Sequence, residues 1–253
     1  MNDKLNYYAL SRKGKKSPQN EDSCSVPNKN KKKSDIKNKG FLFTVCDGLG
    51  GHRAGEVASS ICAKLFKENY YNNTENKEYG ELLKDEIRNL NIRIMEVSRD
   101  FHDYYGMSTT LVSLLIHNET AYINNVGDSR LYLYSQSKLE QLTEDQSPVW
   151  KMYKKGIITK DDIIKHEKKN VISQVIGLEQ DIEINSYRIS LPEKYIFLLC
   201  SDGLTDVTLD KEIEDVISTT TDLKTGVERL YQLSQKNHSL DDVTIILVSN
   251  YLE

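Results

Sequence analysis

Apolar runs and alternating apolar residues divide the chain into segments with the period of strands and segments with the period of helices. Strand patterns occupy 5–11, 22–27, 41–46, 108–118, 120–127, 129–136, 138–143, 195–201 and 243–249. Helix patterns occupy about 53–71, 79–104, 209–219 and 222–236. In the first of these, Val57, Ile61 and Leu65 recur every four residues. The pattern therefore predicts many short strands interrupted by groups of helices.

The connections between these patterns indicate the class of fold. Very short turns separate the three strand patterns between 108 and 136, a spacing typical of antiparallel hairpins rather than of βαβ crossovers. Helices stand between groups of strands. This order predicts an α+β protein in which two mainly antiparallel sheets pack face to face. The lysine-rich stretch 28–40 has no apolar period and is expected to be a solvated loop.

Composition bears on the size of the domain, its cellular location and its possible partners. The chain has 253 residues, 38% of them hydrophobic, which is enough for one large domain with a packed core. A formal net charge of −4 gives no indication of nucleic-acid binding. No apolar run approaches the roughly 20 residues that span a bilayer, and the N-terminus lacks a signal-peptide core. We therefore expect a cytoplasmic protein with no membrane contact. The four cysteines form no Cys-x-x-Cys pair and are expected to be buried thiols.

Five short acidic segments, each beside an apolar strand pattern, carry the chemical information. They are Asn20-Glu21-Asp22, Asp47-Gly48, Gly127-Asp128-Ser129, Ser201-Asp202-Gly203 and Asp241-Asp242. A carboxylate at the edge of a buried strand is costly unless a cation receives it. If the segments meet, they form an all-oxygen site for hard divalent metals. Because they extend from end to end of the chain, we expect a single domain, 1–253.

Each acid taken alone has a plainer interpretation as a surface, turn or capping residue. The glycines after Asp47 also suggest a dinucleotide-binding loop. However, Arg53 stands where the third glycine of that fingerprint belongs, and no parallel βαβ unit surrounds it. The metal interpretation therefore depends on the acids as a set.

Together the segments resemble the metal-dependent type 2C protein phosphatases, particularly the compact bacterial ones. The matching segments are NEDS (20–23), VCDGLGGHRAGEVAS (45–59), GMSTTL (106–111), NVGDSRLYLY (125–134), LTEDQS (142–147), NVISQVIG (170–177), LLCSDGLTD (198–206) and DDVTIILV (241–248). They cover nearly the whole chain in the family's order and approximate spacing. The resemblance implies a four-layer α/β/β/α sandwich, in which helices flank the two sheets.

The resemblance also implies a binuclear Mn²⁺ or Mg²⁺ centre. By motif position, Asp47 would bridge both ions, and Glu21 and the Gly48 carbonyl would complete one side. Asp202 and Asp241 would complete the other side. Two metals roughly 3.5–4 Å apart activate a shared water and neutralise phosphoryl oxygens during attack, so no protein nucleophile is needed.

Two further acids have implied roles in the same centre. Asp22 matches a carboxylate that holds water bound to the metals, so Asp22, Asp47 and Asp202 are the expected catalytic residues. Asp128 matches a ligand of a possible third, weaker ion, which it would share with Asp202. Asp242 occupies the place of an asparagine in the family pattern.

The sequence departs from the family pattern at the expected phosphate site. Most relatives carry a phosphate-binding arginine four residues before the first glutamate, where this chain has Ser17. A hydroxyl does not replace a bidentate guanidinium, so weaker phosphate binding is expected. The neighbouring Lys15 and Lys16 could supply charge, or they could belong to a solvated turn.

Other departures concern the rim of the site. Leu49 stands where animal relatives have a histidine proposed as the leaving-group acid, and His52 is either such an acid or a loop residue. Gln146 replaces a histidine of many relatives and is expected to be structural. Residues 147–169 match the variable flap, in which Trp150 is expected to anchor packing rather than contact substrate.

The sequence therefore predicts a protein phosphatase that hydrolyses phosphoserine and phosphothreonine in phosphoproteins. By resemblance it would be a bacterial, monomeric catalytic domain that opposes a Ser/Thr kinase. A hydrolase of small phosphate esters is one alternative. A phosphoprotein-binding pseudophosphatase is another; the missing arginine favours it, and the complete set of metal carboxylates argues against it.

Overall fold

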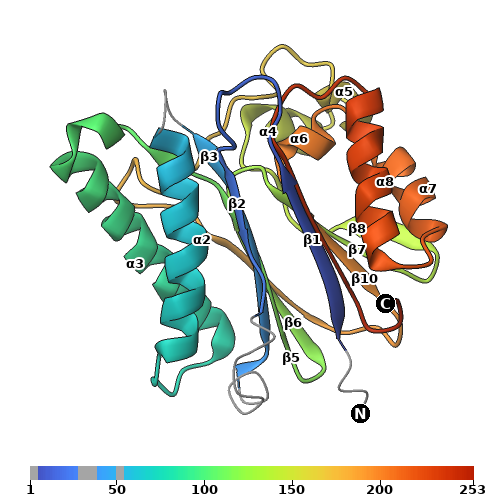
Figure 1. Cartoon of the computed structure of the whole chain (residues 1–253), viewed down its shortest axis with the longest axis horizontal. Coiled ribbons are helices and arrows are strands. Elements are labelled where there is room, and N and C mark those ends of the chain that lie inside the picture. Colours follow the sequence, from blue (N-terminus) through green and yellow to red (C-terminus); the bar gives the residue numbers. More distant parts are fainter. Residues whose placement is uncertain (1–4, 28–38, 50–53) are drawn as a thin grey trace.

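Two β-sheets pack face to face, with helices on both outer faces (Figure 1). The computed structural model describes residues 5–27, 39–49 and 54–253. One sheet is covered by α2 (Ala54–Asn72) and α3 (Tyr79–Asp100), and the other by α7 (Asp210–Ser218) and α8 (Leu223–Lys236). The predicted four-layer α+β sandwich is confirmed.

The first sheet has five strands in the order β1-β11-β10-β7-β8. Their bounds are β1 Asn6–Arg12, β7 Arg130–Ser135, β8 Lys138–Gln141, β10 Ile196–Cys200 and β11 Val243–Ser249. β1 and β11 pair antiparallel, from Asn6 opposite Ser249 to Arg12 opposite Val243. The loop after β1 therefore lies next to the segment that precedes β11.

The second sheet follows the order β2-β3-β5-β6-β9, and β4 pairs with the end of β3. Their bounds are β2 Asp22–Ser25, β3 Phe41–Leu49, β4 Ser108–Thr109, β5 Leu111–His117, β6 Thr120–Val126 and β9 Asn185–Ser190. The sequence pattern missed β9, whose residues alternate between half-buried and exposed without an apolar run. Pairing with β6 holds these residues in a strand, although the composition of β9 does not favour one.

The short turn between β6 and β7 does not form the hairpin that its length predicted, and that expectation was wrong. β6 pairs with β5 and β9, whereas β7 pairs with β10 and β8 in the opposite sheet. The chain crosses between sheets at Gly127, whose φ of 100° favours glycine. Gln146 holds the crossing, because its Oε1 accepts the Gly127 N–H at 2.8 Å. This contact is the structural role expected of Gln146.

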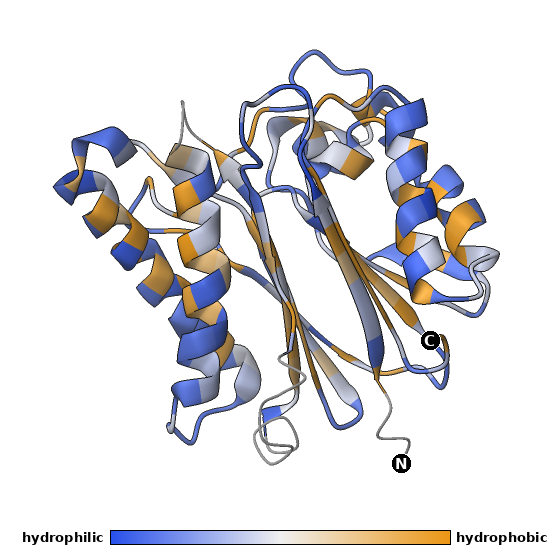
Figure 2. Ribbon diagram, viewed as in Figure 1, coloured by the Kyte–Doolittle hydropathy of each residue, from blue (hydrophilic) through white to orange (hydrophobic). Residues whose placement is uncertain are grey.

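Strand alternation divides the core into three apolar layers. In β3, Leu42 and Cys46 pack toward α2 and α3, whereas Phe43 and Val45 pack between the two sheets. A third cluster lies between the first sheet and helices α7 and α8. Figure 2 shows hydrophobic residues concentrated in the strands and polar residues in the connecting loops. The long apolar strands are therefore buried on both faces.

The flap, residues 147–169, contains α4 (Pro148–Lys154) and α5 (Lys160–Ile163). Trp150 is 6% exposed and packs with Val149 and Ile163, which confirms its predicted role as a packing anchor. Lys160 Nζ donates to Asp210 Oδ2 at 2.5 Å, which ties the flap to the start of α7.

Two further expectations concern the loop at 28–40 and the end of α3. The solvated loop predicted at 28–40 lies mainly outside the described residues, which omit 28–38. α3 ends at Asp100 rather than near 104, because Phe101 leaves helical geometry with a ψ of 112°. None of the helices formed by the described residues is long and apolar enough to span a membrane.

A buried ion pair links two of the family segments and gives a stability prediction. Arg130 Nη2 lies 2.6 Å from Asp145 Oδ2, and both side chains are less than one-tenth exposed. Removing one partner of a buried pair typically costs about 3–5 kcal/mol, because the other charge stays buried. Arg130→Ala should lower the free energy of unfolding in urea by that amount.

The control is Arg88→Ala, which breaks the exposed pair of Arg88 with Asp85 at 2.9 Å. Exposed pairs contribute about 0–1 kcal/mol, so this variant should unfold near the wild-type midpoint. Similar losses in the two variants would contradict the importance of the buried pair.

Candidate metal centre

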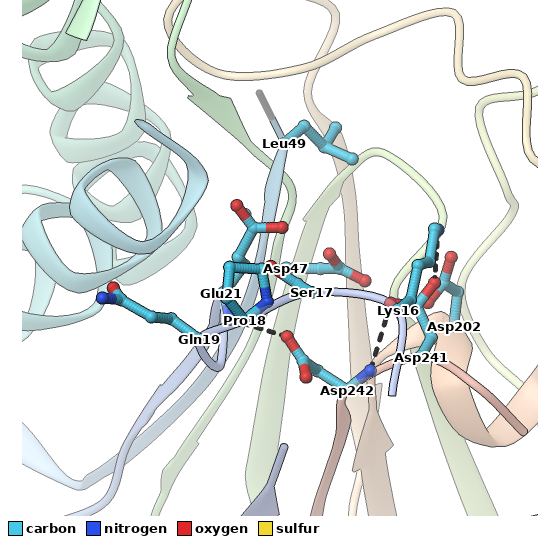
Figure 3. A pocket seen from close by; sticks show the side chains of 11 residues that line it. Lys16, Ser17, Pro18, Gln19, Glu21, Asp47, Leu49, Asp202, Asp241 and Asp242 are labelled. Atoms are coloured by element: carbon cyan, nitrogen blue, oxygen red, sulfur yellow. Dashed lines mark hydrogen bonds and ion pairs between the residues drawn. The ribbon is translucent and has the colours of Figure 1, made fainter. Parts of the chain in front are cut away.

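A cavity of about 660 Å³ opens where strand ends from both sheets meet (Figure 3). The described residues that line it are Lys16, Ser17, Pro18, Gln19, Glu21, Asp47, Gly48, Leu49, Asp202, Asp241 and Asp242. Five of these are acidic, and Lys16 is the only basic one. Figure 3 shows acids from distant segments of the chain around one space. The structure thus brings together Glu21, Asp47, Asp202 and Asp241, which the sequence placed in one site.

The second sheet positions Asp47 and Gly48 at the end of β3. The Asp47 N–H donates to Thr110 Oγ1 at 3.0 Å, and the Asp47 carbonyl accepts the Thr110 N–H at 2.8 Å. The Gly48 N–H donates to the Glu21 carbonyl at 3.1 Å. A β-carbon at Gly48 would overlap the backbone oxygens of Gly55 and Glu21, so only glycine permits this close approach.

The first sheet contributes the opposite wall. Asp202 begins the short helix α6 (Asp202–Thr205) directly after β10, and Asp241 lies just before β11. Asp242 Oδ1 accepts the Gly14 N–H at 2.7 Å, and its Oδ2 accepts the Glu21 N–H at 2.6 Å. Sequence analysis assigned no such function to Asp242. It fastens the loop after β1, and with it Glu21, across the seam between the sheets.

Asp22 is absent from the cavity lining but supports it from behind. It pairs in register with Asp47 across β2 and β3. Its Oδ2 accepts the Ser201 hydroxyl at 2.7 Å, and that hydroxyl accepts the Thr244 N–H at 3.0 Å. Burial raises the pKa of Asp22 to about 7, although hydrogen bonds from Ser201 and Thr244 lower it.

The carboxylates of the cavity repel one another. Burial raises the pKa of Asp47 well above its usual range, and the charges of Asp202 and Asp22 raise it further. Burial also raises the pKa of Asp202, with added repulsion from Asp206 and Asp128. Such acids favour protonation unless a cation lies among them. The site is therefore short of positive charge.

Asp128 lies at the crossing between sheets, outside the cavity lining but electrostatically coupled to Asp202. Burial and the charges of Asp145 and Asp206 raise the pKa of Asp128 to about 7. The sequence missed Asp206, whose backbone N–H donates to the Asp202 carbonyl at 2.8 Å one helical turn away. The four-residue spacing from Asp202 was the available signal, because it places both acids on one helical face.

The donor set fits hard divalent cations. Buried oxygens of three acids lack a hydrogen-bond partner: Glu21 Oε1, Asp128 Oδ1 and Asp202 Oδ1. Unpartnered buried carboxylate oxygens are costly, and Mg²⁺ or Mn²⁺ accepts oxygen ligands of this kind. In the part of the chain that the structure describes, no three acidic, His or Cys side chains already stand as one ion's ligand group.

The residues expected at the phosphate site separate into different positions. Lys16 Nζ donates to Asp241 Oδ2 at 2.6 Å within the cavity. Ser17 lines the cavity, and its side-chain hydrogen bond to Glu21 opposes the rise that burial gives the pKa of Glu21. Lys15 is not among the described lining residues. His52 lies outside the described residues.

Comparison with protein-family models supports this architecture. The model described as Protein phosphatase 2C matches residues 7–151, more than half of the chain. A second model, Stage II sporulation protein E (SpoIIE), matches residues 154–250. The fold is that of a protein phosphatase. The chain belongs to the protein phosphatase 2C family, whose known function is the metal-dependent dephosphorylation of phosphoproteins.

Individual relatives agree with this membership. The serine/threonine phosphatase stp of Listeria welshimeri is 33% identical over 214 residues, which cover 83% of this chain and 85% of that protein. The protein phosphatase PhpP of Streptococcus pneumoniae is 32% identical over 211 residues, 82% of this chain and 85% of that one. The structure of Stp1 from Staphylococcus aureus matches with a TM-score of 0.88 at 30% identity, covering 97% of this chain and 95% of that chain.

Because the carboxylates of the cavity repel one another, replacing one of them should raise the melting temperature in chelator and reduce the stabilisation that Mn²⁺ gives. Asp47→Asn removes one of the mutually repelling charges, so the variant should melt at a higher temperature than wild type in chelator. The same change removes a proposed ligand, so Mn²⁺ should raise its melting temperature less. For wild type, Mn²⁺ at 100 times its dissociation constant should add about 2.7 kcal/mol of stability for each ion site that it fills.

Thermal unfolding with chelator and with Mn²⁺ measures both effects. Asp100→Asn, at the exposed end of α3, should reproduce wild type in both conditions. A lower melting temperature in chelator, combined with an undiminished Mn²⁺ effect, would contradict the crowding of charge at Asp47.

Proposed function

We propose that this chain hydrolyses phosphoserine and phosphothreonine in proteins with the help of two Mn²⁺ or Mg²⁺ ions held in the acidic cavity. The observation that carries this proposal is the meeting of acids from both sheets around one space. Glu21 and Asp47 arrive from one sheet, and Asp202 and Asp241 from the other. No single strand end could supply enough oxygen ligands for two ions.

The ligands are proposed residue by residue. Asp47, at the centre of the repulsion, would contact both ions. Glu21 and the Gly48 carbonyl would hold one ion, and Asp202 and Asp241 the other. When bound, such a pair lowers the pKa of a shared water and neutralises phosphoryl oxygens.

The remaining chemistry belongs to side chains around these ligands. Asp22, which pairs in register with Asp47, would hold water bound to the metals from behind that residue. Ser201 and Thr244 fix its carboxylate through the hydrogen bonds described above. Asp128 and Asp202, with Asp206 beside them, form the acidic group in which a third, weaker ion would bind. That position adjoins the central pair through Asp202.

The wider assignment follows from this activity. Residues 1–253 would form a single catalytic domain, with 147–169 as a flap whose exposed side selects phosphoprotein substrates. We expect it to act as a monomer in the cytoplasm. Because a relative is named serine/threonine phosphatase, we also expect it to oppose a Ser/Thr kinase. We expect neither a nucleic-acid nor a membrane partner.

One comparison of substrates distinguishes this proposal from its two alternatives. Purified protein is assayed on a phosphothreonine peptide and on a chromogenic aryl phosphate, each with Mn²⁺ and with chelator. Metal-dependent turnover with higher kcat/KM on the peptide supports the proposal. Preference for the small ester would indicate a small-ester hydrolase, and peptide binding without turnover would indicate a pseudophosphatase.

Asp202→Asn should reduce metal-dependent turnover by at least about 100-fold, the upper end of losses seen for groups that merely support a metal ligand. The physical reason is that the change removes a charge shared by two proposed ion positions. Steady-state kinetics with saturating Mn²⁺ measure the loss, with Asp100→Asn as the matched control. Wild-type rates in Asp202→Asn would exclude Asp202 from the metal centre.

Asp128→Ala tests the third position separately. Because Asp128 lies outside the cavity lining, the variant should still bind two Mn²⁺ ions in a calorimetric titration while turnover falls several-fold. Loss of both central ions in this variant would refute the peripheral role of Asp128.

A further inference from the structure

Among the described residues that line the acidic cavity, Lys16 is the one cation, and its ammonium already has a partner there. Its Nζ lies 2.6 Å from Asp241 Oδ2, with the lysine side chain 60% exposed and the aspartate 32% exposed. The charges of Asp202 and Asp47 also act on this ammonium. Lys16 therefore interacts with three of the carboxylates that the proposed function assigns to the metals.

The backbone around Lys16 is fixed, whereas its side chain is held only near its tip. The N–H groups of Lys15 and Lys16 donate to the Leu240 carbonyl at 2.7 and 2.9 Å. The Gly14 N–H donates to Asp242 Oδ1 at 2.7 Å. A flexible four-carbon stem on a fixed backbone can exchange partners without moving the loop. An exposed ion pair of this kind is also weak enough to be displaced.

The formal charge of the cavity lining, with and without metal ions, bears on which group Lys16 contacts. Five acids and one lysine give the described lining of the cavity a formal charge of −4. Two divalent ions would bring that charge to zero. A phosphoryl group would then enter a cavity whose described lining is neutral overall and has Lys16 as its one cationic side chain. If the ammonium stayed on Asp241, no cationic side chain of that described lining would face the phosphate.

We infer that Lys16 serves two partners in turn: it neutralises Asp241 while no metal is bound, and it binds the substrate phosphate once a metal has displaced it from Asp241. The inference rests on the proposed function, because it takes Asp241 as a metal ligand. One carboxylate oxygen cannot offer its full charge to an ammonium and to a divalent ion together. Lys16 therefore opposes metal binding and favours phosphate binding.

Lys16→Met separates these two effects because they have opposite signs. The variant lacks both the competing ion pair and the charge that repels the metal, so its Mn²⁺ dissociation constant should fall about two- to fivefold. It also lacks the charged donor to the phosphate, so inorganic phosphate should bind the Mn²⁺-loaded protein about tenfold more weakly. Calorimetric titrations with Mn²⁺, and then with phosphate, measure both constants without any turnover.

Lys15→Met is the matched control. It removes the same charge one residue away, and the Lys15 side chain is not among the described residues that line the cavity. Both constants should stay near wild type in this control. Equal changes in the two variants would show a general charge effect and overturn the inference. Unchanged or weaker Mn²⁺ binding by Lys16→Met would overturn it too, as would unchanged phosphate binding.

A rescue variant distinguishes a lost cation from a damaged loop. Ser17 lines the cavity beside Lys16, so Lys16→Met/Ser17→Arg returns a cation to the same space. Phosphate affinity should recover toward wild type, and failure to recover would overturn the phosphate-binding role. A wild-type protein that binds Mn²⁺ but hydrolyses no phosphoester would refute the proposed function and leave the binding result intact. Efficient hydrolysis with unaltered binding in Lys16→Met would refute only the role of Lys16.

Discussion

The repulsion among carboxylates gathered at the seam between two sheets is the constraint around which the rest of the structure is arranged. Hydrogen bonds at the edge of the cavity hold these acids in place. Thr110 fixes the backbone of Asp47, Ser201 fixes the carboxylate of Asp22, and Asp242 holds the backbone of Glu21. Such an arrangement is unfavourable for a folded protein on its own and becomes favourable with cations. Local structure is thus maintained for a ligand rather than for stability.

The layered fold could largely be predicted from the sequence, because burial on both faces gives β3, β10 and β11 continuous apolar runs. Two features could not. β9 is defined by the strand it pairs with and not by its own composition. The turn at Gly127 has the length of a hairpin, yet the chain changes sheet there, because a sandwich offers the next strand two possible neighbours.

The candidate site also contains residues that could be predicted from the sequence and residues that could not. The four principal acids could be predicted because each lies in a recognisable segment beside a strand. Asp242 could not be assigned its contact with Glu21, since that contact arises only when the loop after β1 is in place. For Asp206, which acts on Asp202 through helix α6, the spacing of four residues was the one signal in the sequence. The sequence could not separate Lys15 from Lys16 either. Their N–H groups share one carbonyl, and the local backbone then decides which side chain reaches the cavity.

The distribution of acids between the sheets has a mechanical consequence. Asp47 is attached to one half of the sandwich and Asp202 to the other. An ion coordinated by both would act as a brace across the interface, so emptying the centre would loosen that rim at the same moment as it removes the catalyst. Fluctuating manganese or magnesium supply would then tune rigidity and reactivity together.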